Sequence, residues 1–519
     1  VREIARLIEA KQEGIFRVDL RLRPYGSAGP LGCSLESFCR YYAPDGPAHA
    51  VERLALVRMR AVAGDPDLGA RLERLRDEMI YAPCRIELEQ LHDVRQKQFL
   101  DKALQGGVNA KFSPGGLVDL EYSVQALQVM HGRFHPDLMT PLLHKALDAL
   151  VDALLLSPLE VEGLRAAYHF LRQLINGMRM LRGSARDLLL PADSSDEYAH
   201  LARRMGYRSQ GGLTPAQRLR LDVETHTAGV RAFVERRFGR SALPGPAPFT
   251  VADLSLSDGL SLETRRRMLS DAGFLQPARA YVNLKTLAGK GFCRETFTRL
   301  SVLAFDMLLH CPDPDRALNN WERYTRVLPS PEAHYRNALA QPMRLEILLT
   351  LFSASQFLAD TLVRHPGFLD WVLLPDILHG RRQKADIEKE LLKDASGDHR
   401  MWLNRLRRQR RREILRIGTR DICLRIPTQE VVEELSAVAE AFIQAALEGT
   451  WEGLEGKGRL RGAPDDVRER FCVLALGKLG GRELNYSSDI DLLGMVEAEG
   501  LSGASAVKEA AARAMEGVR

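Results

Sequence analysis

Residues 471–493 read FCVLALGKLGGRELNYSSDIDLL, and this stretch decides how the rest of the chain is interpreted. The apolar run over 473–476 predicts a buried strand, which the glycines that follow bring to an end. A second strand is predicted to start at Ile490, between Asp489 and Asp491. Because side chains two residues apart on a strand point to the same face, both carboxylates are expected to reach one metal ion.

The glycine turn and the two acids together are typical of a nucleotide site. Glycines let backbone amides approach a triphosphate closely, and carboxylate oxygens hold the Mg²⁺ that accompanies such a phosphate. Two acids at the start of a strand are by themselves more typical of a solvated strand edge, but the glycines beside them favour a metal site. The candidate residues are Gly480, Gly481, Ser488, Asp489 and Asp491.

This pattern resembles the DNA polymerase β-like nucleotidyltransferases, which carry a glycine turn, then Asp-x-Asp, then a third Asp on a later strand. The fuller string GGRELNYSSDIDL resembles the glutamine synthetase adenylyltransferase/adenylyl-removing enzymes. The resemblance implies a transferase site in which Asp489 and Asp491 are the metal ligands and Gly480 and Gly481 form the phosphate turn. It also implies Mg²⁺ as cofactor and ATP as substrate.

A second segment of this kind lies near the N-terminus and reads FRVDLRLRPYGSAGPL over residues 16–31. Its alternation of apolar and polar residues predicts a strand whose polar face carries Asp19, Arg21 and Arg23. The family has a similar DxRLRPxGxxGxL segment, in which the Asp completes a metal triad. The resemblance therefore implies that Asp19 is the third carboxylate of an adenylyl-removing site, with Arg21 and Arg23 as phosphate contacts.

The order of the two segments predicts an internal fragment of a longer protein. The family has two nucleotidyltransferase domains in tandem, the adenylyl-removing one first, and the opening Val1 agrees with a fragment. Neither site is complete, so the chain alone is expected to be an incomplete enzyme. The predicted domains are the C-terminal part of a first nucleotidyltransferase domain (1–108), a helical bundle (109–240), a linker (241–250), a second helical region (251–448) and the N-terminal part of a second nucleotidyltransferase domain (449–519).

Composition predicts a mainly α fold. The resemblance implies that helical bundles link two partial α+β polymerase β-like domains. Leu, Ala, Arg and Glu dominate, and 7% of the residues are aromatic. Apolar periodicity predicts helices over 35–42, 48–62, 67–81 and 85–104, and four helical stretches of an antiparallel bundle over 138–238. Sheet is expected only near the two ends.

The charge, cysteine and hydropathy patterns argue against a nucleic-acid-binding protein, a disulfide or zinc protein and a membrane protein. A net charge of +5 from 73 basic and 68 acidic residues does not by itself indicate that the protein binds nucleic acid. The seven cysteines are scattered without a C-x-x-C pair, which fits reduced thiols better than disulfides or zinc. No apolar run approaches the roughly 20 residues that span a bilayer. A cytoplasmic protein that binds neither nucleic acid nor membrane is expected.

Two further segments carry polar residues in suggestive patterns. In the run NAKFSPGGLVDLE, Lys111, Asp119 and Glu121 resemble a family segment; they either border the nucleotide or order the catalytic domain, or they form a plain polar helix face. The most basic run, 400–425, interleaves arginines with leucines and isoleucines and predicts an amphipathic helix. Its arginines are expected to face an acidic protein partner or neighbouring carboxylates, or to be solvated.

The resemblance implies a pair of opposing reactions: AMP passes from ATP to a tyrosine of glutamine synthetase, and inorganic phosphate removes it again as ADP. Glutamine synthetase and a PII signal protein are the partners that the resemblance implies. Two alternatives remain open. One is another polymerase β-like nucleotidyltransferase, acting on RNA or a small molecule. The other is a helical scaffold without activity that binds glutamine synthetase or PII.

Overall fold

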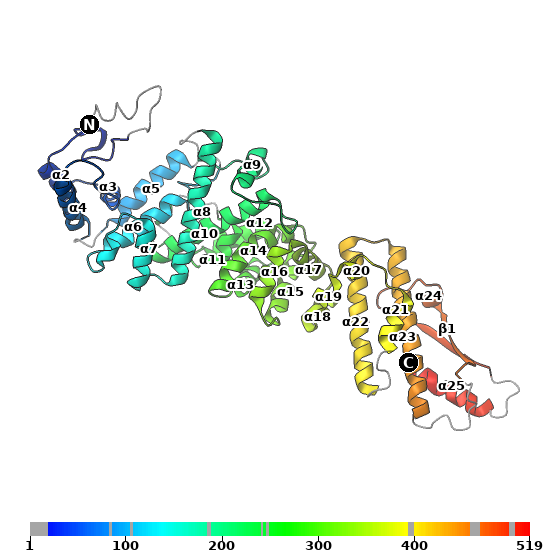
Figure 1. Cartoon of the computed structure of the whole chain (residues 1–519). Coiled ribbons are helices and arrows are strands. Elements are labelled where there is room, and N and C mark those ends of the chain that lie inside the picture. Colours follow the sequence, from blue (N-terminus) through cyan, green and yellow to red (C-terminus); the bar gives the residue numbers. More distant parts are fainter. Residues whose placement is uncertain are drawn as a thin grey trace. The chain divides into compact units, whose positions relative to one another are not determined.

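The computed structural model describes residues 19–81, 86–103, 107–183, 188–239, 242–244, 249–392, 399–456, 468–497 and 504–518. It is mainly helical, as the composition predicts, and the one sheet within these residues has two strands (Figure 1). The chain divides into two compact units. The first holds the described residues up to 272 with 277–306 and 332–342, and the second holds 273–276, 307–331 and the described residues from 343 on.

The first unit begins with an irregular segment followed by short helices. Its elements are η1 (Gly26–Ala28), α2 (Leu35–Tyr42), α3 (Ala50–Leu56), α4 (Pro66–Ile80) and α5 (Leu88–Lys102). The helix predicted over 48–62 is shorter, because Arg58 and Met59 bond to carbonyls three residues back and the chain then leaves the helix. Asp65 caps α4 by accepting from the Leu68 backbone N–H at 2.7 Å.

The strand predicted over 16–31 is wrong for residues 19–31, none of which lies in a strand; residues 16–18 lie outside the described part. The Asp19 carboxylate accepts from the Arg21 backbone N–H at 3.0 Å, which is a local turn. Tyr25 then takes a left-handed backbone with φ of 62°. Such side-chain bonds to the backbone offer a segment an alternative to strand pairing.

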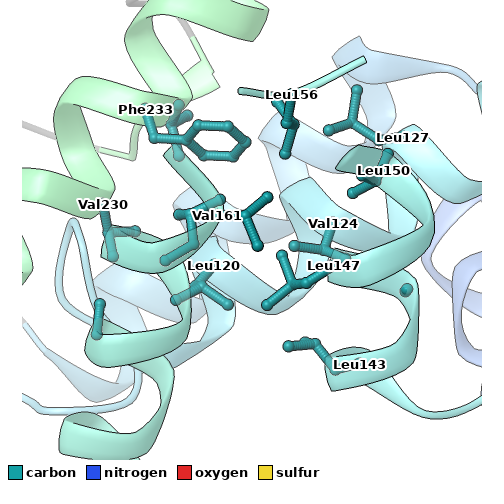
Figure 2. Close-up of a cluster of buried hydrophobic side chains, with 14 of the residues drawn as sticks. Leu120, Val124, Leu127, Leu143, Leu147, Leu150, Leu156, Val161, Val230 and Phe233 are labelled. Carbon is teal, nitrogen blue, oxygen red and sulfur yellow. The ribbon is translucent and has the colours of Figure 1, made fainter. Parts of the chain in front are cut away.

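The helical bundle follows, with the four helices predicted between 138 and 238. Its elements are α6 (Leu117–His131), η2 (Pro136–Leu138), α7 (Leu143–Asp152), α8 (Pro158–Arg182), α9 (Asp196–Arg204) and α10 (Pro215–Phe238). Their apolar faces meet in a cluster that includes Leu120, Leu147, Val161 and Phe233, from four different helices (Figure 2). All four side chains are buried, so this cluster is the core of the bundle.

The remaining helices of the first unit continue from the bundle. They are α11 (Val251–Leu256), α12 (Leu262–Asp271), α13 (Pro277–Ala288), most of α14 (Phe292–Leu309) and most of α16 (Pro331–Ala340). α11 packs on α10 through a buried ion pair between Arg231 and Asp253 at 2.7 Å. The predicted linker 241–250 therefore lies inside the first compact unit; residues 240–241 and 245–248 are outside the described part.

The second unit is built around two long helices in contact. Its helices are α15 (Pro314–Arg326), α17 (Pro342–Ala354), α18 (Gln356–Arg364), α19 (Phe368–Val372), α20 (Pro375–Leu378), α21 (Lys384–Leu392), α22 (His399–Leu424), α23 (Thr428–Gly456), α24 (Gly477–Gly480) and α25 (Ala504–Val518). The buried polar side chains between α22 and α23 form ion pairs, in which Arg416 and Arg420 both contact Glu434. Apolar residues of α21, α22 and α23 surround these pairs.

The two strands, β1 (Phe471–Leu476) and β2 (Asp491–Val496), form an antiparallel hairpin. Phe471 faces inward and packs against Trp451 of α23, with ring centroids 5.8 Å apart. The opposite face is exposed and apolar, and Leu493 and Met495 lie on it. This confirms the predicted pair of strands, with β2 beginning one residue later than predicted. The burial predicted for the first strand is wrong, because Leu474 and Leu476 lie on the exposed face. No helix in the described ranges has the length and apolar character needed to cross a membrane.

Candidate functional site

In the turn after β1, the backbone of Gly477 lies close to Asp491, the second acid of the motif. The hairpin register pairs Leu476 with Asp491, and Gly477 follows with a left-handed φ of 57°. A Cβ atom at Gly477 would lie 2.7 Å from an Asp491 carboxylate oxygen. Glycine is thus needed both for the backbone conformation and for the space that the carboxylate occupies.

Of the two glycines predicted to form the phosphate turn, only one is sterically required. A Cβ atom at Gly480 would lie 2.7 Å from the Ala475 carbonyl oxygen, so a side chain would push the turn away from β1. Gly481 has an ordinary backbone φ of −81°, and its nearest neighbours would be 3.8 Å away. The glycine nearest the acids is Gly477, which sequence reasoning treated only as the end of the strand.

Asp489 and Asp491 are both exposed, and neither forms an ion pair with another described residue. Asp491 is the first residue of β2, on its exposed side, and Asp489 precedes it by two residues. No group of three metal-binding side chains occurs among the described residues. Two free carboxylates fit Mg²⁺, which usually takes one or two protein carboxylates together with substrate phosphates.

The loop between the glycine turn and β2 is fastened to α22 and α23. Leu484 is buried, and its backbone N–H donates to the Ser436 hydroxyl at 3.2 Å. The Tyr486 hydroxyl donates to the Asp421 carboxylate at 3.1 Å. Burial, and then the neighbouring Asp421, raise the pKa of Tyr486, so this hydroxyl keeps its proton. The helices thereby fix the segment that ends in Asp489.

A cavity of about 540 Å³ opens beside this loop, between α18 and α22. Ser488, Tyr486 and Asp421 line one part of it, and Arg410 and Phe357 line another. Its size lies within the range of small-molecule sites. Sequence reasoning missed this cavity, because its walls come from three segments that are more than 50 residues apart in the chain.

The N-terminal candidates lie in the first unit and form a compact turn of their own. The Arg21 guanidinium donates to Asp19 at 2.6 Å and 2.9 Å, and these bonds lower the pKa of Asp19 to about 2. Both side chains are exposed. Arg23 donates instead to backbone carbonyls, including Gly29 at 3.1 Å and Ser27 at 3.3 Å, and so holds the turn closed.

The Lys111 segment fastens helices together. Asp119 is buried, and it accepts from Arg95 of α5 at 2.7 Å and from the Gly115 backbone N–H at 2.7 Å. Glu121 forms ion pairs at 3.2 Å with Arg58 and with Arg172 of α8. The Lys111 pKa is lowered by burial. These contacts favour the ordering role among the alternatives, since Asp119 and Glu121 link three helices and the loop after α3.

Comparison with known protein families gives two matches. The model of the glutamate-ammonia ligase adenylyltransferase family matches residues 2–75 and 345–515, which include both motif segments. The model of the GlnD PII-uridylyltransferase family matches residues 87–238, which cover the helical bundle.

Curated relatives match nearly the whole chain. Proteins named bifunctional glutamine synthetase adenylyltransferase/adenylyl-removing enzyme are 28% identical over 96% of this chain in Thioalkalivibrio sulfidiphilus and 30% identical over 92% in Pseudomonas aeruginosa. A protein of the same name in Mycobacterium tuberculosis is 28% identical over 98% of the chain. The chain spans about half the length of these relatives, namely 53%, 50% and 51%. By these matches it belongs to the glutamine synthetase adenylyltransferase/adenylyl-removing enzyme family.

Proposed function

We propose that this chain takes part in the adenylylation of glutamine synthetase, in which AMP passes from ATP to a tyrosine. The observation that carries the proposal is the hairpin turn, where the Asp491 carboxylate lies against Gly477 and Asp489 is free of ion pairs with described residues. The relatives that match the chain are named for this reaction. In the reaction the tyrosine oxygen bonds to the α-phosphorus, the bond to the β-phosphate breaks, pyrophosphate leaves and the tyrosine proton passes to a base.

Each side chain of the turn has a defined task in this proposal. Asp489 and Asp491 would hold Mg²⁺, which when bound neutralises charge on the phosphates. The bare backbone at Gly480 and Gly481 would admit the triphosphate, and Ser488 would donate a hydrogen bond to it. The cavity that Ser488 lines would receive the nucleoside end. The contacts of Leu484 and Tyr486 support this arrangement, because they hold the loop still.

The opposing reaction, removal of AMP by inorganic phosphate, is proposed for the N-terminal turn. Asp19 would be a metal ligand and Arg21 a phosphate contact there. Their ion pair is exposed, so its partners can be exchanged at little cost. A phosphate at Arg23 would have to compete with the backbone carbonyls that this side chain binds.

The proposed partners are glutamine synthetase and a PII signal protein, in the cytoplasm and without nucleic acid or membrane. The match of residues 87–238 to a family named for PII uridylylation supports a role for the helical bundle in PII signalling. The names of the relatives support glutamine synthetase as the substrate.

The test combines binding with turnover. Binding of Mn²⁺·ATP is measured for the chain and for Asp489→Asn/Asp491→Asn, with Glu497→Gln as a matched control that removes an exposed carboxylate just after β2. Transfer of label from α-labelled ATP to purified glutamine synthetase is measured in parallel. The double variant is expected to lose Mn²⁺·ATP binding and any transfer, and the control to keep both.

Three outcomes would count against the proposal. Equal Mn²⁺·ATP affinity in the chain and in the double variant would place the metal elsewhere. Tight binding of glutamine synthetase by a chain that transfers no label and is unaffected by the double variant would favour the scaffold alternative. Transfer of label to RNA in place of glutamine synthetase would favour another nucleotidyltransferase activity.

A further inference from the structure

The two halves of helix α22 differ in how their arginines are balanced by acidic residues. Its buried C-terminal half pairs each arginine with carboxylates: Arg416 contacts Glu413 and Glu434, both at 2.9 Å. Its N-terminal half carries seven arginines and no Asp or Glu between residues 400 and 412. The positive charge of this half is therefore not balanced within the helix.

Three of these arginines line one cavity. Arg405, Arg408 and Arg412 follow one another at spacings of three and four residues, which places them on one face of the helix. Together with Phe368 and Trp371 of α19 they line a cavity of about 470 Å³. The cavity is distinct from the one beside Ser488, with which it shares no residue.

Aromatic rings orient the guanidinium groups in this cavity. The Arg412 guanidinium lies 3.8 Å from the centre of the Trp371 ring, and the Arg408 guanidinium lies 5.6 Å from the centre of the Phe368 ring. Arg412 is held further by Glu390 at 3.4 Å. A stacked guanidinium keeps its N–H edges available in a fixed plane, which is the geometry that binds carboxylates bidentately.

The charge of the arginines that line the cavity is only partly compensated, since Arg412 contacts Glu390. Among the described residues no carboxylate pairs with Arg408 or Arg411. Burial, and then Arg408, Arg411 and Arg364, lower the pKa of His365, which stacks on Phe368 with ring centroids 4.8 Å apart. The histidine thus adds little positive charge near neutral pH, and the arginines determine the local potential.

We propose that this cavity, the arginine pocket formed by Arg405, Arg408, Arg412, Phe368 and Trp371, binds an extended acidic segment of a protein partner. The arginines rise by about 4.5 and 6 Å along the helix, and side chains two apart on an extended peptide are about 7 Å apart. Alternate acidic residues of such a segment are spaced somewhat more widely than the arginines, and the long arginine side chains can take up the difference. The rings already carry guanidinium groups, which disfavours a nucleic acid, whose bases need free aromatic faces. The proposal is independent of nucleotidyl transfer.

The rim of the pocket offers a way to test it without altering charge. Gly367 lines the pocket with an ordinary helical backbone φ of −64°, and a Cβ atom there would meet nothing within 4 Å. Gly367→Leu is therefore expected to fold normally and to fill part of the space. Arg405→Glu/Arg408→Glu reverses the charge at two pocket positions. Arg266→Glu/Arg267→Glu on α12 makes the same charge change at exposed positions of the first unit that do not line the pocket.

The experiment measures fluorescence anisotropy of a labelled eight-residue peptide of alternating Glu and Ser, titrated with the 519-residue chain at low and moderate salt. We expect saturable binding that weakens with salt and falls at least about tenfold in Arg405→Glu/Arg408→Glu. Gly367→Leu is expected to weaken binding several-fold, and Arg266→Glu/Arg267→Glu to leave it within about twofold. Melting curves of the variants verify that they are folded.

Three results would overturn the inference. The first is absence of saturable peptide binding at low salt. The second is equal loss in the pocket variant and in the Arg266→Glu/Arg267→Glu control, which would mean diffuse charge rather than a site. The third is tighter binding of a labelled uridine octanucleotide than of the acidic peptide, lost in the same pocket variant, which would make the pocket a nucleic-acid site.

Discussion

At the scale of single residues, Gly477 controls where the Asp491 carboxylate can lie. Gly477→Ala would strain a left-handed backbone by about 1 kcal/mol and would place a methyl group 2.7 Å from that carboxylate. We expect the carboxylate to move, so that Mn²⁺·ATP affinity falls at least about tenfold. Titration calorimetry measures this loss. Gly481→Ala, which meets neighbours only at 3.8 Å, is expected to bind normally, and equal losses in the two variants would contradict the assignment.

A histidine of α10 makes a second prediction at this scale. His226 stacks on Phe170 with ring centroids 4.6 Å apart, and burial lowers its pKa to about 4. An unfolded histidine takes up a proton near pH 6.5, so between pH 6.5 and 4 the unfolded state binds more protons than the folded state. The stability of the folded state therefore decreases as the pH is lowered through this range. Urea unfolding should show a loss of up to about 3 kcal/mol over this window. The loss should disappear in His226→Phe; an unchanged pH slope in that variant would assign the effect to other groups.

At the scale of elements, the ion pairs between α22 and α23 lie in an apolar core. Glu434 is 1% exposed and contacts both Arg416 and Arg420. Glu434→Gln would leave their positive charges buried without a full counter-charge, and we expect a loss of about 3 kcal/mol in urea unfolding. The neighbouring Glu433 pairs with Arg381 nearer the surface, and Glu433→Gln should change little. Similar losses in both variants would refute this difference.

The sequence predicts elements better than it predicts contacts between them. Periodicity and turn residues identify the helix over 35–42 and the hairpin with its glycine turn. The strand expected around Asp19 fails, because Arg21 bonds to that carboxylate locally and no described strand pairs with the segment. Partners such as Arg95 and Asp119 are 24 residues apart on different helices, and charge patterns do not determine which helices meet.

At the scale of the whole molecule, the sequence predicts the candidate residues of the hairpin but not the cavities around them. Asp489 and Asp491 can be recognised from the sequence, because side chains two residues apart on a strand point to the same face. The cavity beside Ser488 and the arginine pocket combine α22 with helices that precede it in the chain, so they exist only once the second unit has folded. The basic run of α22 was expected to face a partner, nearby carboxylates or solvent. Its C-terminal half pairs with carboxylates, and a partner is proposed for its N-terminal half.

The division of the chain into two compact units predicts how it unfolds on heating. Contacts within each unit are denser than contacts between them, so scanning calorimetry should show two transitions where a single cooperative domain would show one. Leu147→Ala opens a cavity in the bundle core, where this side chain is fully buried, and should cost its own unit about 2–5 kcal/mol. It should lower one transition, whereas Glu434→Gln should lower the other. One transition that both variants shift equally would mean that the units unfold together and that the two halves of the chain share their stability.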